Sequence, residues 1–158
     1  MIIKGLIDED FVNYKKPSMY IAFPSCTFKC EKECGQKMCQ NSSLATAPDI
    51  DMSVEEIVNR YLQNPITRAI VCGGLEPMDS WSDLVNFIDE FRKHTEDDIV
   101  IYTGYKMDEI CKKTYWLGNK YKNIIFKMGR FIPNKQSHYD EVLGVNLASS
   151  NQYAEVIS

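Results

Sequence analysis

The sequence predicts an α/β protein built on a mainly parallel sheet that helices cover. Short apolar segments at 19–23, 69–72, 99–102 and 123–127 are nearly continuous, which is typical of strands buried on both faces. Segments with helical periodicity alternate with them, and this order favours parallel strands joined by crossover helices. With 158 residues the chain is long enough for a real core, and we expect one domain over residues 1–158.

Local signals place the helices between these strands. The first strand stops at Pro24, and a cysteine-rich loop then runs to about residue 48. Ser53 and Glu56 form a capping box before an apolar stripe that ends at Pro65. The run 80–83 has the same pattern before a second helix, with Ser80 as the expected cap. A third helix is expected near 107–117, and the less regular last stretch contains a possible strand at 142–143.

The composition is that of an ordinary soluble globular protein, with 44% hydrophobic and 25% charged residues. A formal net charge of −4 argues against nucleic acid as the main partner. No apolar run approaches the ~18 residues that a membrane span needs. Because the first ten residues include acidic positions where a signal peptide would stay apolar, we expect a cytoplasmic protein with neither nucleic acid nor membrane as a partner.

Four of the six cysteines lie between positions 26 and 39, and such crowding is typical of metal-binding segments. Cys26 and Cys30 are separated by three residues, and Cys39 follows on the same loop. Three thiolates would hold three irons of a [4Fe–4S] cluster and leave the fourth iron open to a substrate. Cys34 is an alternative third ligand. We expect Cys72 and Cys111 to be small buried residues without a ligand role.

Other interpretations of the cysteine loop remain open from the spacing alone. A structural zinc site could use all four cysteines, although zinc sites usually contain Cys-x2-Cys pairs and this loop has none. Unligated thiols are the third interpretation. Zinc or a cluster without radical chemistry would make the protein a binding or electron-transfer module instead of an enzyme.

Two further loops follow strands and should meet the cysteine loop, because ligands of parallel sheets gather beyond the carboxyl ends of the strands. Gly73 and Gly74 would let the backbone approach a ligand closely, with a plain tight turn as the alternative. The second loop follows the strand that ends near residue 102. Polar contacts to a nucleoside could come from Tyr102, Thr103 and Gly104, and from Asn151 near the C-terminus.

Taken in order, these motifs resemble the radical S-adenosylmethionine superfamily, and more closely the activating protein of the anaerobic (class III) ribonucleotide reductase. The resemblance covers nearly the whole chain. It depends on Cys26-x3-Cys30, on Cys39-Gln40-Asn41, on Gly-Gly-Leu-Glu-Pro at 73–77, on Ile-Tyr-Thr-Gly-Tyr at 101–105, on Gly-Arg-Phe-Ile at 129–132 and on Ser-Ser-Asn-Gln at 149–152.

The sequence departs from that family in three places. The usual spacing is Cys-x3-Cys-x2-Cys, whereas eight residues separate Cys30 from Cys39 here. We prefer Cys39 to Cys34 as third ligand, because Met38 and Asn41 fit the family pattern around it. Met128 stands where an acidic residue is common, and Tyr153 stands where the activators tend to have arginine.

The resemblance implies an enzyme with a [4Fe–4S] cluster on Cys26, Cys30 and Cys39, and with S-adenosylmethionine bound at the open iron. Reductive cleavage would give a 5′-deoxyadenosyl radical, which would generate a glycyl radical on a partner enzyme, expected to be anaerobic ribonucleotide reductase. A flavodoxin- or ferredoxin-type protein would donate the electron. A radical enzyme that acts on another substrate is the alternative within the same superfamily.

The resemblance also implies a fold and a set of cofactor-binding residues. We expect a partial (β/α) barrel that is open on one side, because 158 residues are too few for a full eight-stranded barrel, which needs about 200 or more. The open side would admit a macromolecular substrate. The cofactor-binding residues implied by the family pattern are Met38, Gly73, Gly74, Glu76, Tyr102, Thr103, Gly104 and Asn151.

Overall fold

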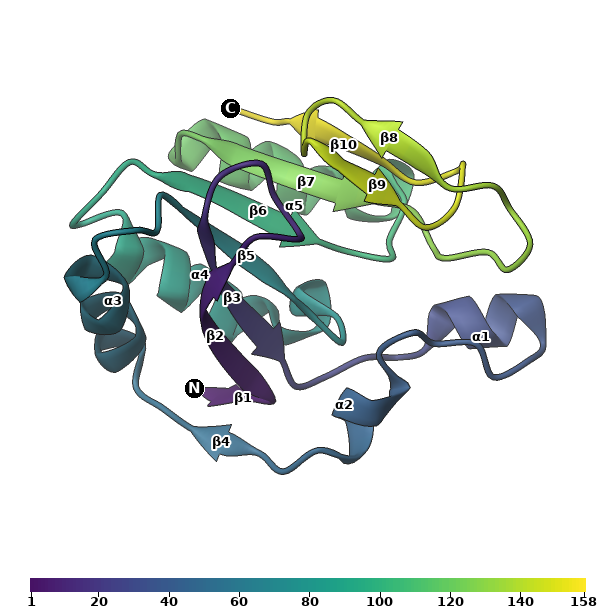
Figure 1. Cartoon of the computed structure of the whole chain (residues 1–158), viewed down its shortest axis with the longest axis horizontal. Helices are drawn as coiled ribbons and strands as arrows, with labels where there is room; N and C mark the ends of the chain where they lie inside the picture. The colour runs from purple at the N-terminus through teal and green to yellow at the C-terminus, as the bar shows by residue number, and fades with distance from the viewer.

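A six-stranded mixed sheet is the centre of the computed structural model, which describes residues 1–158 (Figure 1). Its strand order is β10-β7-β6-β5-β3-β2. The four inner strands are parallel, and each edge strand pairs antiparallel with its neighbour. The inner strands are β3 (Ser18–Phe23), β5 (Ala69–Gly74), β6 (Asp98–Tyr102) and β7 (Ile124–Met128), and the edges are β2 (Gly5–Asp10) and β10 (Tyr153–Val156).

The α/β class with parallel inner strands agrees with the prediction, and the partial barrel stays a prediction. The edge strands were not predicted, because their half-exposed residues lack the continuous apolar pattern of the inner strands. The strand expected at 142–143 is wrong. Those residues form the turn between β8 (His138–Asp140) and β9 (Val145–Leu147), where the amide of Leu143 donates to the Asp140 carboxylate at 2.9 Å. A further two-stranded pair joins β1 (Ile2–Ile3) to β4 (Ile50–Asp51).

The long helices lie at the expected places. They are α3 (Val54–Gln63), α4 (Trp81–Phe91) and α5 (Met107–Lys120). The Ser53 hydroxyl caps α3 by accepting from the amide of Glu56 at 3.1 Å, as predicted. The cap predicted at Ser80 is wrong: its side chain makes no capping bond, because the 3₁₀ turn η1 (Pro77–Ser80) leads directly into α4.

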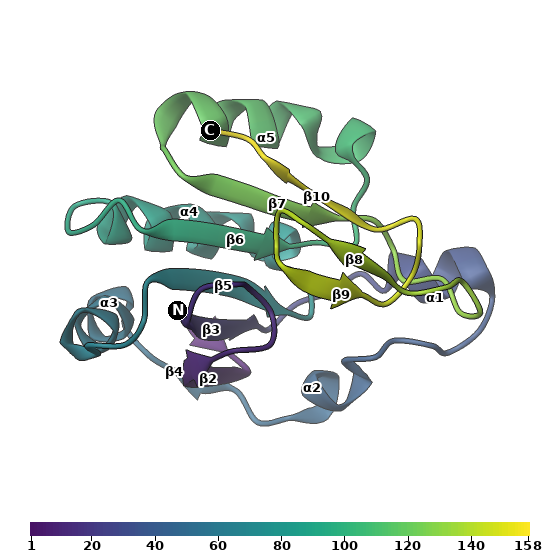
Figure 2. The same ribbon diagram turned by 45° about the horizontal axis from the view of Figure 1, so that its top comes forward.

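Two hydrophobic clusters cover the two faces of the sheet. The larger one contains 22 buried residues and lies beneath the three long helices, whereas a smaller one of seven lies beneath the β8–β9 hairpin. Figure 2 shows the hairpin on the face of the sheet away from α4 and α5. The strand pleat assigns Ile124, Phe126 and Met128 to the helical face and Ile125 to the hairpin face.

The two isolated cysteines differ in burial. Cys72 is fully buried in β5, as predicted. The prediction for Cys111 is wrong, because α5 buries Ile110, Thr114 and Leu117 and leaves Cys111 exposed beside that stripe. No helix of the structure has both the length and the apolar character needed to cross a membrane.

Candidate functional site

A cavity of about 310 Å³ opens at the carboxyl ends of the parallel strands, on the face that the hairpin covers. This volume lies in the range of about 300–1,000 Å³ that is typical of small-molecule sites. The three loops expected to meet all contribute to its wall. Its lining includes the thiols of Cys26, Cys30 and Cys39, the buried charges of Glu76 and Lys127, and polar groups of Asn13, Asn41, Thr103, Asn146 and Gln152.

The cysteine loop presents three of its four cysteines to this cavity. Cys34, at the end of the short helix α1 (Lys29–Cys34), is exposed and does not line the cavity. The turn before α1 depends on Phe28, which has a left-handed conformation with φ 52° and donates its amide to the Cys26 sulfur at 3.2 Å. Cys39 therefore shares the cavity with Cys26 and Cys30, and its role as third ligand stays a prediction.

Side-chain contacts fix the segment around Cys39. The Glu31 carboxylate accepts hydrogen bonds from the amides of Met38 and Cys39, both at 3.1 Å. After the third cysteine, the Asn41 side chain donates to the carbonyl of Gly74 at 2.8 Å. This contact connects the cysteine loop to the glycine turn, and the short helix α2 (Ser42–Thr46) follows it.

Burial favours the protonated form of the Cys26 and Cys30 thiols by raising their pKa values. It raises the pKa of Cys26 to about 11, and it also raises the pKa of Cys30, although the neighbouring Arg130 opposes that shift. Metal binding requires thiolates and releases their protons. Loading of this site with iron is therefore expected to be favoured by alkaline pH.

Glu76 is buried at the end of β5 and organises two loops. Its carboxylate accepts from the amide of Gly104 at 2.8 Å and from the amide of Met78 at 3.1 Å. Burial raises its pKa to about 7. Glu76 therefore joins the glycine turn to the strand end at Gly104, where the absence of a Cβ leaves room for the Cys30 sulfur.

Lys127 is a site residue that sequence reasoning missed. It lies on the hairpin face of β7, is 8% exposed, and makes one long hydrogen bond of 3.4 Å to the carbonyl of Gly129. Burial lowers its pKa to about 8. A lysine inside an otherwise apolar strand was the available signal, since buried lysines usually have a partner. Its ammonium also lies 5.7 Å from the centre of the Tyr102 ring, and no carboxylate of the protein bonds to it.

Most of the predicted cofactor-binding residues line the cavity, and two do not. Met38, Gly74, Glu76, Tyr102, Thr103 and Gly104 belong to its wall. Gly73 lies within β5 against the Tyr20 ring, where a Cβ would be 2.7 Å from the phenol oxygen. Asn151 instead supports the neighbouring segment, because its amide donates to the carbonyl of Arg130 at 2.8 Å.

The three cavity cysteines can be compared with what a cluster and a single metal ion require. No group of three or more His, Cys, Asp or Glu residues is placed to hold one metal ion. In a [4Fe–4S] cluster each thiolate binds a different iron, so the sulfurs surround the cluster instead of converging on one point. Three partly buried cysteines around one cavity are compatible with that requirement.

Comparison with known families decides the general class. The model of the 4Fe-4S single cluster domain matches residues 18–153, which is most of the chain. The chain belongs to this family. The predicted iron–sulfur cluster is thus confirmed at the level of the family, and the zinc interpretation is disfavoured. No curated protein and no solved structure matches the chain.

Proposed function

We propose that this 4Fe-4S domain is a radical S-adenosylmethionine enzyme that generates a glycyl radical on a partner enzyme. The observation that carries the proposal is the joint lining of one cavity by Cys26, Cys30 and Cys39, next to the buried charges of Glu76 and Lys127. Cys26, Cys30 and Cys39 would hold three irons of the cluster and would leave the fourth for the amino and carboxylate groups of the cofactor. When bound and reduced, the cluster would supply one electron for cleavage of the sulfonium to methionine and a 5′-deoxyadenosyl radical.

The residues of the cavity suit the parts of this cofactor. Lys127 supplies a positive charge without a carboxylate of the protein bonded to it, and it can bind the cofactor's carboxylate. The strand end at Tyr102 and Thr103 lies at the cavity wall and can contact the nucleoside. The carbonyl of Gly74 already accepts a hydrogen bond from Asn41, so the cofactor's amino group would share that carbonyl.

The partner's glycine would have to reach the same cavity. Transfer of a hydrogen atom from the glycine Cα to the 5′-carbon would yield 5′-deoxyadenosine and leave the radical on the partner. The cavity is open to solvent beside the exposed Val12, which is 73% exposed and part of its lining. Anaerobic ribonucleotide reductase is the partner we propose, with a flavodoxin- or ferredoxin-type protein as electron donor.

Electron paramagnetic resonance of the reconstituted, reduced protein tests this proposal. We expect a [4Fe–4S]⁺ signal that changes when S-adenosylmethionine is added. If the cluster signal does not change when the cofactor is added, the protein is better described as an electron-transfer module. Zinc in place of iron would contradict the presence of the cluster itself. In parallel, Cys34→Ala should keep its iron and Cys39→Ala should lose it. The opposite pattern would show that Cys34 is the third ligand.

A further inference from the structure

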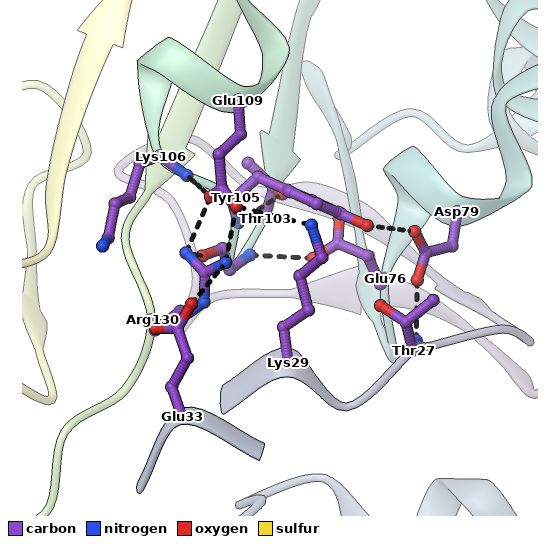
Figure 3. A network of polar contacts seen from close by, with 11 residues as sticks. Thr27, Lys29, Glu33, Glu76, Asp79, Thr103, Tyr105, Lys106, Glu109 and Arg130 are labelled. Atoms are coloured by element: carbon purple, nitrogen blue, oxygen red, sulfur yellow. Dashed lines mark hydrogen bonds and ion pairs between the residues drawn. The ribbon is translucent and has the colours of Figure 1, made fainter. Parts of the chain in front are cut away.

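The segment at 129–132 carries a charge that the proposed function does not use. The side chain of Arg130 is 4% exposed, and its guanidinium donates two parallel hydrogen bonds of 2.7 Å to the carboxylate of Glu109. The carboxylate of Glu33, in α1, lies 3.0 Å from the same guanidinium. Arg130 thus connects the first turn of α5 to the helix that carries Cys30 (Figure 3).

This charge lies beside a predicted cluster ligand. Arg130, Cys26 and Cys30 line one small cavity of about 20 Å³, next to the larger one. A Cβ built on Gly104 would be 3.3 Å from the Cys30 sulfur and 3.9 Å from Cγ of Arg130, so both side chains approach the same glycine.

The structure holds Arg130 in this position from several sides. Its own carbonyl accepts from the Asn151 side chain at 2.8 Å, and the preceding amide, of Gly129, donates to the carbonyl of Tyr105 at 3.0 Å. The guanidinium lowers the pKa of Glu109 to about 2, so the carboxylate of this pair stays ionised. Arg130 lines the small cavity together with Cys26 and Cys30, whereas Glu109 does not; Lys29 and Glu76 are the other charged residues of its lining.

We propose that Arg130 is a positioning residue that raises the reduction potential of the cluster by holding a permanent positive charge beside the Cys30 sulfur. Reduction by a one-electron donor adds one negative charge to the cluster, and a nearby cation stabilises the reduced form more than the oxidised form. Local charge and hydrogen bonds to the sulfurs are among the factors that set such potentials. This inference rests on the cluster of the proposed function but not on its radical chemistry.

A redox titration followed by electron paramagnetic resonance, without S-adenosylmethionine, tests this role. Arg130→Gln should shift the midpoint potential to more negative values, and Arg130→Lys should stay closer to the wild-type value because it keeps the charge. Glu109→Gln removes one of the two negative charges beside the guanidinium and should shift the potential in the positive direction. Arg60→Gln is the matched control, since Arg60 forms a similar fork with Asp8 at 2.6 Å, on α3 at the other end of the molecule from α1 (Figure 1).

The outcomes separate this inference from the proposed function. Equal potentials in Arg130→Gln, Glu109→Gln and wild-type protein would overturn it, as would a shift in Arg130→Lys as large as that in Arg130→Gln. If Arg130→Gln fails to fold, the positive shift expected in Glu109→Gln decides the matter. A cluster with the expected potentials whose signal does not change with S-adenosylmethionine would overturn the radical chemistry alone. Absence of any cluster in the wild type would overturn both the role of Arg130 and the proposed function.

Discussion

The glycine turn after β5 allows a sharp stability prediction. Gly74 has φ 89°, a conformation that L side chains rarely adopt, and a Cβ there would lie 2.7 Å from Cα of Ala22 and 2.8 Å from the amide nitrogen of Phe23. Both clashing atoms belong to the backbone of the neighbouring strand β3, which cannot move away as a side chain would. Gly74→Ala is therefore expected to strain both the turn and the pairing of β3 with β5.

The magnitude follows from two separate contributions. The left-handed conformation costs about 1–2 kcal/mol for a residue with a Cβ, and forcing an extra methyl into a packed site costs about 1–3 kcal/mol. Gly74→Ala should thus lower the free energy of unfolding by about 2–5 kcal/mol. Gly35→Ala is the matched control, because Gly35 has φ 68° and no atom within 4 Å of its added Cβ.

Urea unfolding of the reduced apoprotein, followed by circular dichroism, measures both variants. Gly35→Ala should cost no more than about 1–2 kcal/mol, since only the conformational contribution applies. The excess cost of Gly74→Ala over Gly35→Ala then reports the close approach of the two strands. Equal costs for the two variants would refute the reasoning that backbone contact at Gly74 requires glycine.

Three other predictions concern the buried charges and one helix cap. Burial raises the pKa of Glu76 from 4.5 to about 7, so its contribution to stability is full below pH 4.5 and is lost as the pH rises through 7. As the pH rises through this range, the free energy of unfolding of Glu76→Gln, measured in urea, should increase by about 3 kcal/mol relative to that of the wild type. Parallel pH profiles of the two proteins would contradict this. Lys127→Met should keep its iron, but its affinity for S-adenosylmethionine, measured by calorimetry, should fall by about tenfold or more, since hydrogen bonds to charged groups contribute about 1.5–3 kcal/mol. Unchanged affinity would exclude this contact. Ser53→Ala should lower the free energy of unfolding by about 1 kcal/mol in urea, and no change would show that the cap is dispensable.

The inner part of the fold could be predicted because its signals are local. The four parallel strands are buried on both faces, so their sequences are apolar throughout and stand out from the rest. The edge strand β10 shows no such signal, since three of its four residues are exposed. It forms because the unpaired side of β7 offers it hydrogen-bonding groups, and that partner is distant in sequence.

The candidate site divides in the same way. The crowded cysteines and the glycines after strand ends predicted a ligand site, because both patterns are unusual and local. Which cysteines share the cavity depends on the folding of the loop, where Glu31 binds the amide of Cys39 while Cys34 faces solvent. The pleat of β7 likewise decides that Lys127 faces the cavity, and the sequence marks this residue only as an exception in an apolar strand.

The sequence by itself therefore determined the α/β class and the order of the main elements, since each depends on patterns within a few neighbouring residues, and it marked the cysteine loop as a candidate metal-binding segment. Only the tertiary structure decided the placement of single charges. In the sequence, Arg130 is part of the motif at 129–132 and has no predicted role. It lies beside Cys30 because the end of β7, the start of α5 and helix α1 meet there. Electrostatic influence depends on distance through space and on burial, and neither quantity is contained in the spacing along the chain.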